Sequence, residues 1–288
     1  MPKCAGGTFT YHIQKNLRSD EYLSLYPDQF VHNPYKYDTS IDIRELAQKK
    51  AKSLSKNKRS RIKIIFGHSV PYGIHNYFDK KPYYFTTLRN PTERVISLYN
   101  FWCTIIFHRQ DFQLLQKPIN RKLLEKGIPP DIECWLESFM SQKVTTPSNS
   151  MASFLRRYKY LENKIDDNSL NKLVSKFDFI GLIENNNEDL LYMYYKLKFC
   201  KFFKNQNISE TFFLPDLANK MYIANLKKII NSNYEADLAI YKKARKRNSI
   251  LRSNKEYHNK IKILKKITNF PQPLSELTAR IIYALNSG

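Results

Sequence analysis

The sequence lacks the features that mark metal-binding, redox-active and membrane-spanning proteins. Its 4 cysteines are widely spaced, and none of them forms the CxxC pair of zinc or disulfide-exchange sites. No window approaches about 18 consecutive apolar residues, and the first residues have no apolar core of a signal peptide. These absences predict a reduced, cytoplasmic protein that can approach a membrane surface but does not span it.

Internal repeats and long Gly/Ser-rich or Pro-rich linkers are also absent, so nothing in the composition marks a domain boundary. The 288 residues are 42% hydrophobic and 14% aromatic, which gives the chain enough apolar area to offset its conformational entropy. We therefore expect one domain over residues 1–288, with an α/β fold and a helix-rich C-terminal part.

Acidic residues are scarce relative to basic ones: 26 Asp and Glu face 48 Lys and Arg, which gives a formal charge of +22. Such a field attracts nucleotides, acidic glycans, nucleic acids and anionic membranes. The many Lys, Asn, Ile and Tyr residues are equally typical of A/T-rich coding sequence, so the charge has two explanations. The run from Lys242 to Lys266 holds eleven Lys or Arg and one acid, Glu256, and we interpret it as a solvated basic helix.

Three short apolar segments read as β-strands. The first covers residues 62–66 and is followed by Gly67 and His68. The second covers residues 83–88 and is followed by Arg89, and the third covers residues 177–183. Helical patterns lie between them, and alternation of strands and helices favours a parallel sheet.

Two helix starts are well marked. Phe9, Ile13 and Leu17 recur at helical spacing after a loop of small residues. Asn90 to Glu93 supplies an N-cap, a first-turn proline and an acid at the third helical position. The polar, lysine-rich stretch from Tyr22 to Ser60 is predicted to be a surface excursion.

The loop ahead of the first helix has the composition of an anion cradle. Gly6 and Gly7 let backbone N–H groups approach an anion, and the positive end of a helix follows them. The loop is not a Walker A motif, because Lys3 precedes the glycines and Thr8 alone follows them. A P-loop kinase is therefore excluded.

Arg89 and Ser97 define a second anion site. The strand that ends at Leu88 presents Arg89 at its C-terminal end, and Ser97 lies about two turns into the next helix. A guanidinium and a hydroxyl placed in this way can grip one phosphate from two sides.

The order and residue types of these two segments resemble the sulfotransferases that use 3′-phosphoadenosine-5′-phosphosulfate (PAPS), in particular the branch of heparan sulfate 2-O- and 6-O-sulfotransferases and their bacterial relatives. The resemblance implies a P-loop-like three-layer fold with a central parallel sheet between helices. It implies that Arg89 and Ser97 hold the 3′-phosphate of PAPS. The residues that it assigns to the 5′-phosphosulfate are Lys3, Cys4, Ala5, Gly6, Gly7 and Thr8.

Phe66 to His75 resembles the histidine-bearing segment of that family, and it makes His68 the candidate general base, with His75 in reserve. A histidine beside a glycine also serves simply to satisfy backbone groups, and this structural role stays open. Lys3 is the candidate for stabilising charge on the leaving nucleotide. The scheme needs no metal, and the sequence shows no carboxylate pair or HxxxH site for one.

The resemblance implies a carbohydrate acceptor, anionic if the basic surface takes part in binding it. It also implies a buried strand ahead of the phosphosulfate loop, and since only Met1 precedes Pro2, we expect that strand to be missing and the loop to be weakly anchored. Two other hypotheses remain: a non-catalytic relative that has lost the nucleotide site, and a nucleic-acid-binding protein. The second is disfavoured because no helix-turn-helix, zinc-finger or RNP signature is present.

Overall fold

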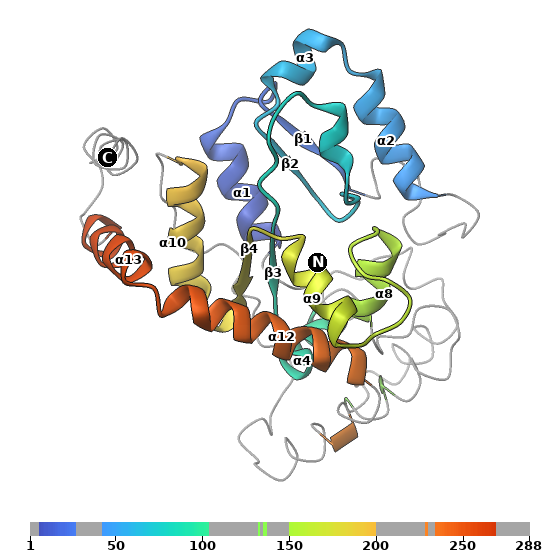
Figure 1. Ribbon diagram of the computed structural model, residues 1–288, viewed down its shortest axis with the longest axis vertical. Helices are drawn as coiled ribbons and strands as arrows, with labels where there is room; N and C mark the ends of the chain where they lie inside the picture. The colour runs from blue at the N-terminus through green and yellow to red at the C-terminus, as the bar shows by residue number, and fades with distance from the viewer. Residues whose placement is uncertain are drawn as a thin grey trace.

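The structure is a computed structural model, shown in Figure 1. It describes residues 6–26, 42–103, 132, 135–136, 150–199, 228–229 and 234–268.

Two pairs of parallel strands form the β-structure of the described residues. β1 (Tyr22–Ser24) pairs with β2 (Ile64–Phe66), and β3 (Phe85–Leu88) pairs with β4 (Phe179–Leu182). The three predicted strands and their parallel arrangement are thus confirmed, with β3 and β4 each shorter than their apolar runs. Helices and parallel strands alternate as in the predicted α/β class.

α1 (Gly6–Asn16) begins at the first of the two loop glycines. Ile13 is fully buried, and Phe9 and Leu17 pack beside it against β2, as the helical spacing predicted. α1 therefore presents its apolar face to the strands and directs its amino-terminal turn toward the loop that precedes it.

The described part of the stretch from 22 to 60 corrects the sequence interpretation, because it forms regular elements that bury four apolar side chains, Leu23, Leu25, Ala47 and Ala51. It contains β1, α2 (Ile43–Ser53) and α3 (Lys56–Arg61). Leu23 is 7% exposed, and Ala47 and Ala51, one helical turn apart, are fully buried. The apolar positions that form this small core are few and lie among lysines, so the sequence pattern did not reveal it. The basic run of α3, which buries no residue, lies on the surface as predicted.

α4 (Pro91–Cys103) begins where the sequence placed it. The Asn90 Oδ1 atom accepts the N–H of Thr92 at 2.9 Å, and its carbonyl accepts the N–H of Arg94 at 2.8 Å. Val95 is fully buried. The cap thus fixes the angle at which the chain turns from β3 into the helix.

The remaining regular elements of the described chain are helices. Its helices are α8 (Ser150–Arg157), α9 (Asp167–Ser175), α10 (Asn186–Leu197), α12 (Glu235–Arg252) and α13 (Lys255–Thr268), with short 3₁₀ helices at Ile74–Tyr77 and Ile183–Asn185. Figure 1 shows α12 running across the β3–β4 pair, while β1 and β2 lie with α2 and α3 toward the other end. The helix-rich C-terminal part is confirmed, and the basic run divides into α12 and α13 instead of one helix.

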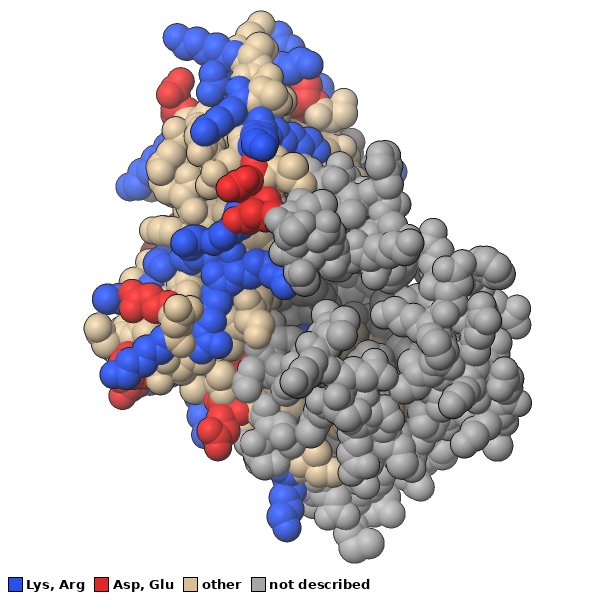
Figure 2. Space-filling view, turned by 90° about the vertical axis from the view of Figure 1, so that its right-hand side faces the viewer, with Lys and Arg blue, Asp and Glu red and all other residues tan. Residues whose placement is uncertain are grey.

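Basic side chains cover much of the described surface. Figure 2 shows Lys and Arg spread over one face, with Asp and Glu in small groups between them. On α12, Lys242, Arg245 and Lys246 are exposed, while Tyr241 and Ala244 face the core. The basic run is therefore solvated on one side and packed on the other, as expected for a surface helix.

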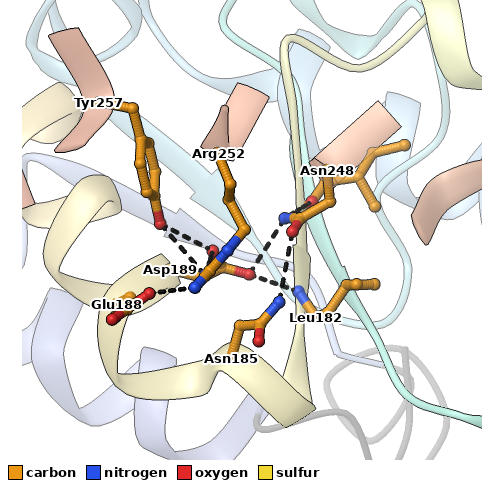
Figure 3. Close-up of polar contacts among 8 residues, drawn as sticks. Leu182, Asn185, Glu188, Asp189, Asn248, Arg252 and Tyr257 are labelled. Atoms are coloured by element: carbon orange, nitrogen blue, oxygen red, sulfur yellow. Dashed lines mark hydrogen bonds and ion pairs between the residues drawn. The ribbon is translucent and has the colours of Figure 1, made fainter. Parts of the chain in front are cut away.

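A buried carboxylate fastens α10 to its neighbours (Figure 3). Asp189, 3% exposed, accepts the N–H of Leu182 at the end of β4 at 2.7 Å and the amide of Asn248 at 3.2 Å. Its other oxygen accepts from the Tyr257 hydroxyl at 3.2 Å and from Arg252 at 3.4 Å. Burial raises the pKa of Asp189, and these four donors compensate the buried oxygens. One side chain thus joins α10, β4, α12 and α13.

Candidate active site

A cavity of about 310 Å³ lies between β2 and β3. Phe9 and Thr10 of α1 line it, as do His68 and His75, and the β3 side reaches as far as Thr87. Both histidine candidates therefore face one chamber, next to the helix that follows the predicted phosphosulfate loop.

His68 owes its position to an unusual backbone turn. Gly67 has φ +134°, and a Cβ built on it would lie 2.1 Å from the carbonyl oxygen of Leu25. Only glycine allows β2 to pass this close to the end of β1 and then turn into the cavity. The His68 ring packs edge-on against Tyr26, with the ring centroids 5.0 Å apart.

Burial lowers the pKa of His68 to about 3. Its imidazole is therefore neutral at pH 7 and has a lone pair to accept a proton, as a general base requires. The same burial makes it a weaker base than an ordinary histidine, because an imidazolium in this position is poorly solvated.

His75 has a defined hydrogen bond. Its Nδ1 atom lies 2.7 Å from the hydroxyl of Tyr84, and the same hydroxyl oxygen accepts the N–H of Gly73 at 3.0 Å. The phenol thus orients the ring from the strand side of the cavity. Tyr84 was not identified from the sequence, and no local pattern signals it.

Arg89 lies directly after β3, as predicted. Its side chain is 25% exposed and lies 3.7 Å from the carboxylate of Glu93 one helical turn on. Ser97 is half-buried on α4, and neither residue lines the cavity. The two predicted 3′-phosphate ligands therefore belong to one strand–helix unit next to the cavity rather than inside it.

Glu184 is a second residue whose role the sequence did not reveal. Its Oε1 atom accepts the N–H of Asn90 at 2.8 Å, across 94 positions of sequence. Burial, followed by the nearby charge of Glu184, raises the pKa of Tyr241 to about 12. Glu184 thus ties the end of β4 to the turn that carries Arg89. The sequence feature that could have indicated this contact is a carboxylate two residues beyond a buried strand.

The predicted phosphosulfate loop is only partly described. Lys3, Cys4 and Ala5 lie outside the described residues, whereas Gly6, Gly7 and Thr8 form the first turn of α1. That turn holds no acidic residue, so its free N–H groups and positive dipole end suit an anion.

Within the described part of the chain, no group of three or more His, Cys, Asp or Glu side chains is placed to hold a metal ion. None of the helices described there is both long and apolar enough to cross a bilayer.

Comparison with known proteins identifies the family. A protein-family model described as the sulfotransferase family matches residues 1–249. No curated protein and no solved structure gives a significant match. The family match covers both predicted anion sites and all four strands, and the mixed α/β architecture agrees with it. The chain belongs to the sulfotransferase family.

Proposed function

We propose that this protein transfers a sulfuryl group from PAPS to a hydroxyl group of a carbohydrate. The observation that carries the proposal is the strand–turn–helix unit at Arg89. There Asn90 caps α4 and donates its backbone N–H to the carboxylate of Glu184, which follows β4, so that Arg89 and Ser97 extend from a fixed backbone. Such preorganisation is what recognition of a phosphate by a guanidinium and a hydroxyl requires.

The chemistry is one in-line displacement. The acceptor oxygen attacks sulfur, the bond from sulfur to the bridging phosphate oxygen breaks, and the nucleotide leaves with that electron pair as 3′-phosphoadenosine-5′-phosphate (PAP). His68 takes the proton of the attacking hydroxyl, and its neutral form at pH 7 suits this step. Lys3 neutralises the charge that develops on the leaving oxygen, while Thr8 and the N–H groups of Cys4 to Gly7 hold the phosphosulfate.

His75 stays the alternative base. It lines the same cavity, and the Tyr84 hydroxyl fixes its Nδ1 side. No metal takes part in the scheme, because positioning and charge stabilisation supply the catalysis.

The basic surface supports an anionic glycan as the acceptor. We place the reaction in the cytoplasm, where the same surface can approach an anionic membrane. We expect no nucleic-acid partner, because the sequence carries no nucleic-acid-binding signature.

The test is a double substitution, Arg89→Ala with Ser97→Ala, followed by calorimetric titration with PAP and with ADP, which lacks the 3′-phosphate. Loss of two hydrogen bonds to a charged group is expected to weaken PAP binding roughly 100-fold, about 3 kcal/mol, and to leave ADP binding unchanged. Arg61→Ala is the matched control, because Arg61 is an exposed arginine on α3 paired with Asp20 at 3.3 Å. A double variant that binds PAP as tightly as the parent chain would overturn the assignment.

A further inference from the structure

The position of the His75 ring is fixed by the short helix that carries it. Gly73, with φ +90°, directs the chain into the 3₁₀ helix Ile74–Tyr77. Ile74 is 3% exposed and packs in the same small core as Leu25, which anchors this helix. His75 follows Ile74, and its ring lines the cavity. The ring is thus held in place by its own backbone before any ligand binds.

The Tyr84 side chain is restrained by neighbouring rings. Its ring centroid lies 5.2 Å from that of Tyr72 and 6.1 Å from that of Tyr160, which is 6% exposed. The His75 ring meets it edge-on, with the centroids 5.5 Å apart. Rings packed on several sides hold the Tyr84 hydroxyl in place, so the proton positions around its oxygen can be assigned from the hydrogen-bond network.

The Tyr84 hydroxyl oxygen accepts hydrogen bonds from the main chain. The N–H of Gly73 donates to it at 3.0 Å. Burial raises the pKa of Tyr84, and the backbone N–H groups of Gly73 and His75 act on the same oxygen in the opposite sense, as donors to a phenol oxygen do. The main chain therefore takes up the lone pairs of this oxygen.

The hydroxyl proton of Tyr84 then has one acceptor among the described residues. The Nδ1 atom of His75 lies 2.7 Å from the oxygen, and the hydroxyl forms no further hydrogen bond within that part of the chain. If Nδ1 carried a proton, the phenol oxygen would face several N–H donors, and its own O–H would lack an acceptor there. The network therefore requires a bare Nδ1, which places the proton of the imidazole on Nε2.

We propose that His75 donates a hydrogen bond from Nε2–H to an oxygen of the acceptor substrate, and that His68 is the base of the transfer. This inference rests on the proposed function and decides between its two candidate bases. A nitrogen that already carries its proton cannot take another from the attacking hydroxyl. It can donate to a hydroxyl, ether or carboxylate oxygen of a carbohydrate.

The Nε2 atom of His75 is available for this role, since the described residues offer it no hydrogen-bond partner. Most of the cavity wall is apolar, and in such a site one well-placed donor determines how a ligand is oriented. Tyr84 is then a positioning residue, because it fixes the tautomer of His75 without touching the substrate.

The tautomer is tested by nitrogen NMR of the protein labelled at histidine, since protonated and bare ring nitrogens give distinct signals. We expect the proton of the His75 ring on Nε2. Tyr84→Phe removes the hydroxyl and should let the ring populate both tautomers. Tyr72→Phe is the matched control, because it removes a hydroxyl from the same group of rings and leaves this bond intact. A proton on Nδ1 in the unmodified protein, or an unchanged tautomer in Tyr84→Phe, would overturn the assignment.

A second arm measures transfer kinetics with PAPS and an unsulfated glucuronic-acid polysaccharide as the probe. His75→Phe should raise KM for the polysaccharide roughly fivefold, the equivalent of about 1 kcal/mol, because one hydrogen bond is lost. His75→Gln keeps an N–H donor and should restore most of that loss. His68→Gln should instead lower kcat roughly 100-fold. A fall in kcat of that size in His75→Gln would overturn the proposal.

The two arms separate the possible failures. If the unmodified protein transfers no sulfuryl group, the proposed function fails, and the role of His75 at the substrate fails with it. The NMR arm needs neither nucleotide nor polysaccharide, so it decides the tautomer in either case. A bare Nδ1 without transfer would thus contradict the sulfotransferase assignment and leave the effect of Tyr84 on His75 established.

Discussion

The two strand pairs are held in different ways. Carboxylates fasten the β3–β4 pair: Asp178 accepts the N–H of Tyr84, Glu184 that of Asn90, and Asp189 that of Leu182. All four residues of β4 are buried, whereas β1 buries only its middle residue. At the start of the β1–β2 pair, Glu21 forms an ion pair with the exposed Lys63 at 2.6 Å. At its end, main-chain contacts take the place of carboxylates: the Leu25 carbonyl accepts the N–H of Ser69 at 2.9 Å beside the close passage of Gly67.

The two strand pairs therefore have different proposed roles. The pair that carries Arg89 has its strand ends fixed by carboxylates that flank β4 or lie on the helix after it, which would keep the proposed phosphate site rigid. The pair that carries His68 depends on one glycine and a small core around Leu25 and Ala47. We therefore expect single substitutions to disable the His68 region by steric clash and the Arg89 region by loss of charge-assisted hydrogen bonds.

Gly67→Ala should have the largest effect. Its Cβ would lie 2.1 Å from the Leu25 carbonyl oxygen, and a backbone atom cannot move aside as a flexible side chain does. We expect a loss of about 4 kcal/mol in the free energy of unfolding, measured by urea denaturation.

Gly73→Ala is the matched control for this substitution. Gly73 also has positive φ, +90°, but a Cβ there meets nothing closer than the Asn76 amide at 3.8 Å. Its cost should stay near 1 kcal/mol. Equal losses for the two variants would show that backbone conformation, and not the close approach of the two strands, makes glycine necessary at position 67.

Asp189→Asn should cost about 2–3 kcal/mol in the free energy of unfolding. An amide in place of the carboxylate keeps one acceptor oxygen, loses the charge that faces Arg252, and directs an N–H₂ group at a donor. Asp167→Asn on α9 is the control, because its side chain is 93% exposed and its pair with Lys243 is worth little. A loss below about 0.5 kcal/mol for Asp189→Asn would mean that the cluster in Figure 3 does not stabilise the fold.

Mild acid should have the smallest effect. Burial lowers the pKa of His12 to about 4 and that of His68 to about 3, from an ordinary 6.5. Near pH 6 the unfolded chain therefore binds protons that the folded chain does not, so stability is present above pH 6.5 and falls as the pH decreases. Each histidine should contribute roughly 0.7 kcal/mol of loss between pH 7 and pH 6. Urea midpoints at these two pH values measure it, and a His68→Gln variant with an undiminished pH slope would contradict the assignment.

Local chemistry explains what the sequence predicted well. Asn90 and Pro91 predict the start of α4, and short apolar runs predict β2 and β4. These signals could be recognised because a helix cap or an apolar run involves only a few neighbouring residues. β1 escaped prediction although Leu23 and Leu25 alternate with Ser24, because the alternation is short and lies in a polar stretch, and burial of the segment depends on α2. Periodicity has little power over three residues.

Long-range contacts explain what could not be predicted in the candidate site. Glu184 and Asn90 are 94 positions apart, and Asn248 and Tyr257 lie 59 and 68 positions from Asp189. No local pattern encodes such pairs. The sequence placed His68 at a strand end, but its burial beside Tyr26 depends on how β1 ends, which only the fold reveals.

The most direct test of the proposed function is a calorimetric titration of the unmodified protein with PAP and with ADP, at physiological salt and at about 0.5 M salt, where screening weakens contacts with a diffuse basic surface. We predict that PAP binds at least 100-fold more tightly than ADP, as expected when a guanidinium and a hydroxyl grip the 3′-phosphate, and that most of this preference survives the higher salt. Equal binding of the two nucleotides, or binding that disappears at the higher salt, would contradict a PAPS site at Arg89 and Ser97.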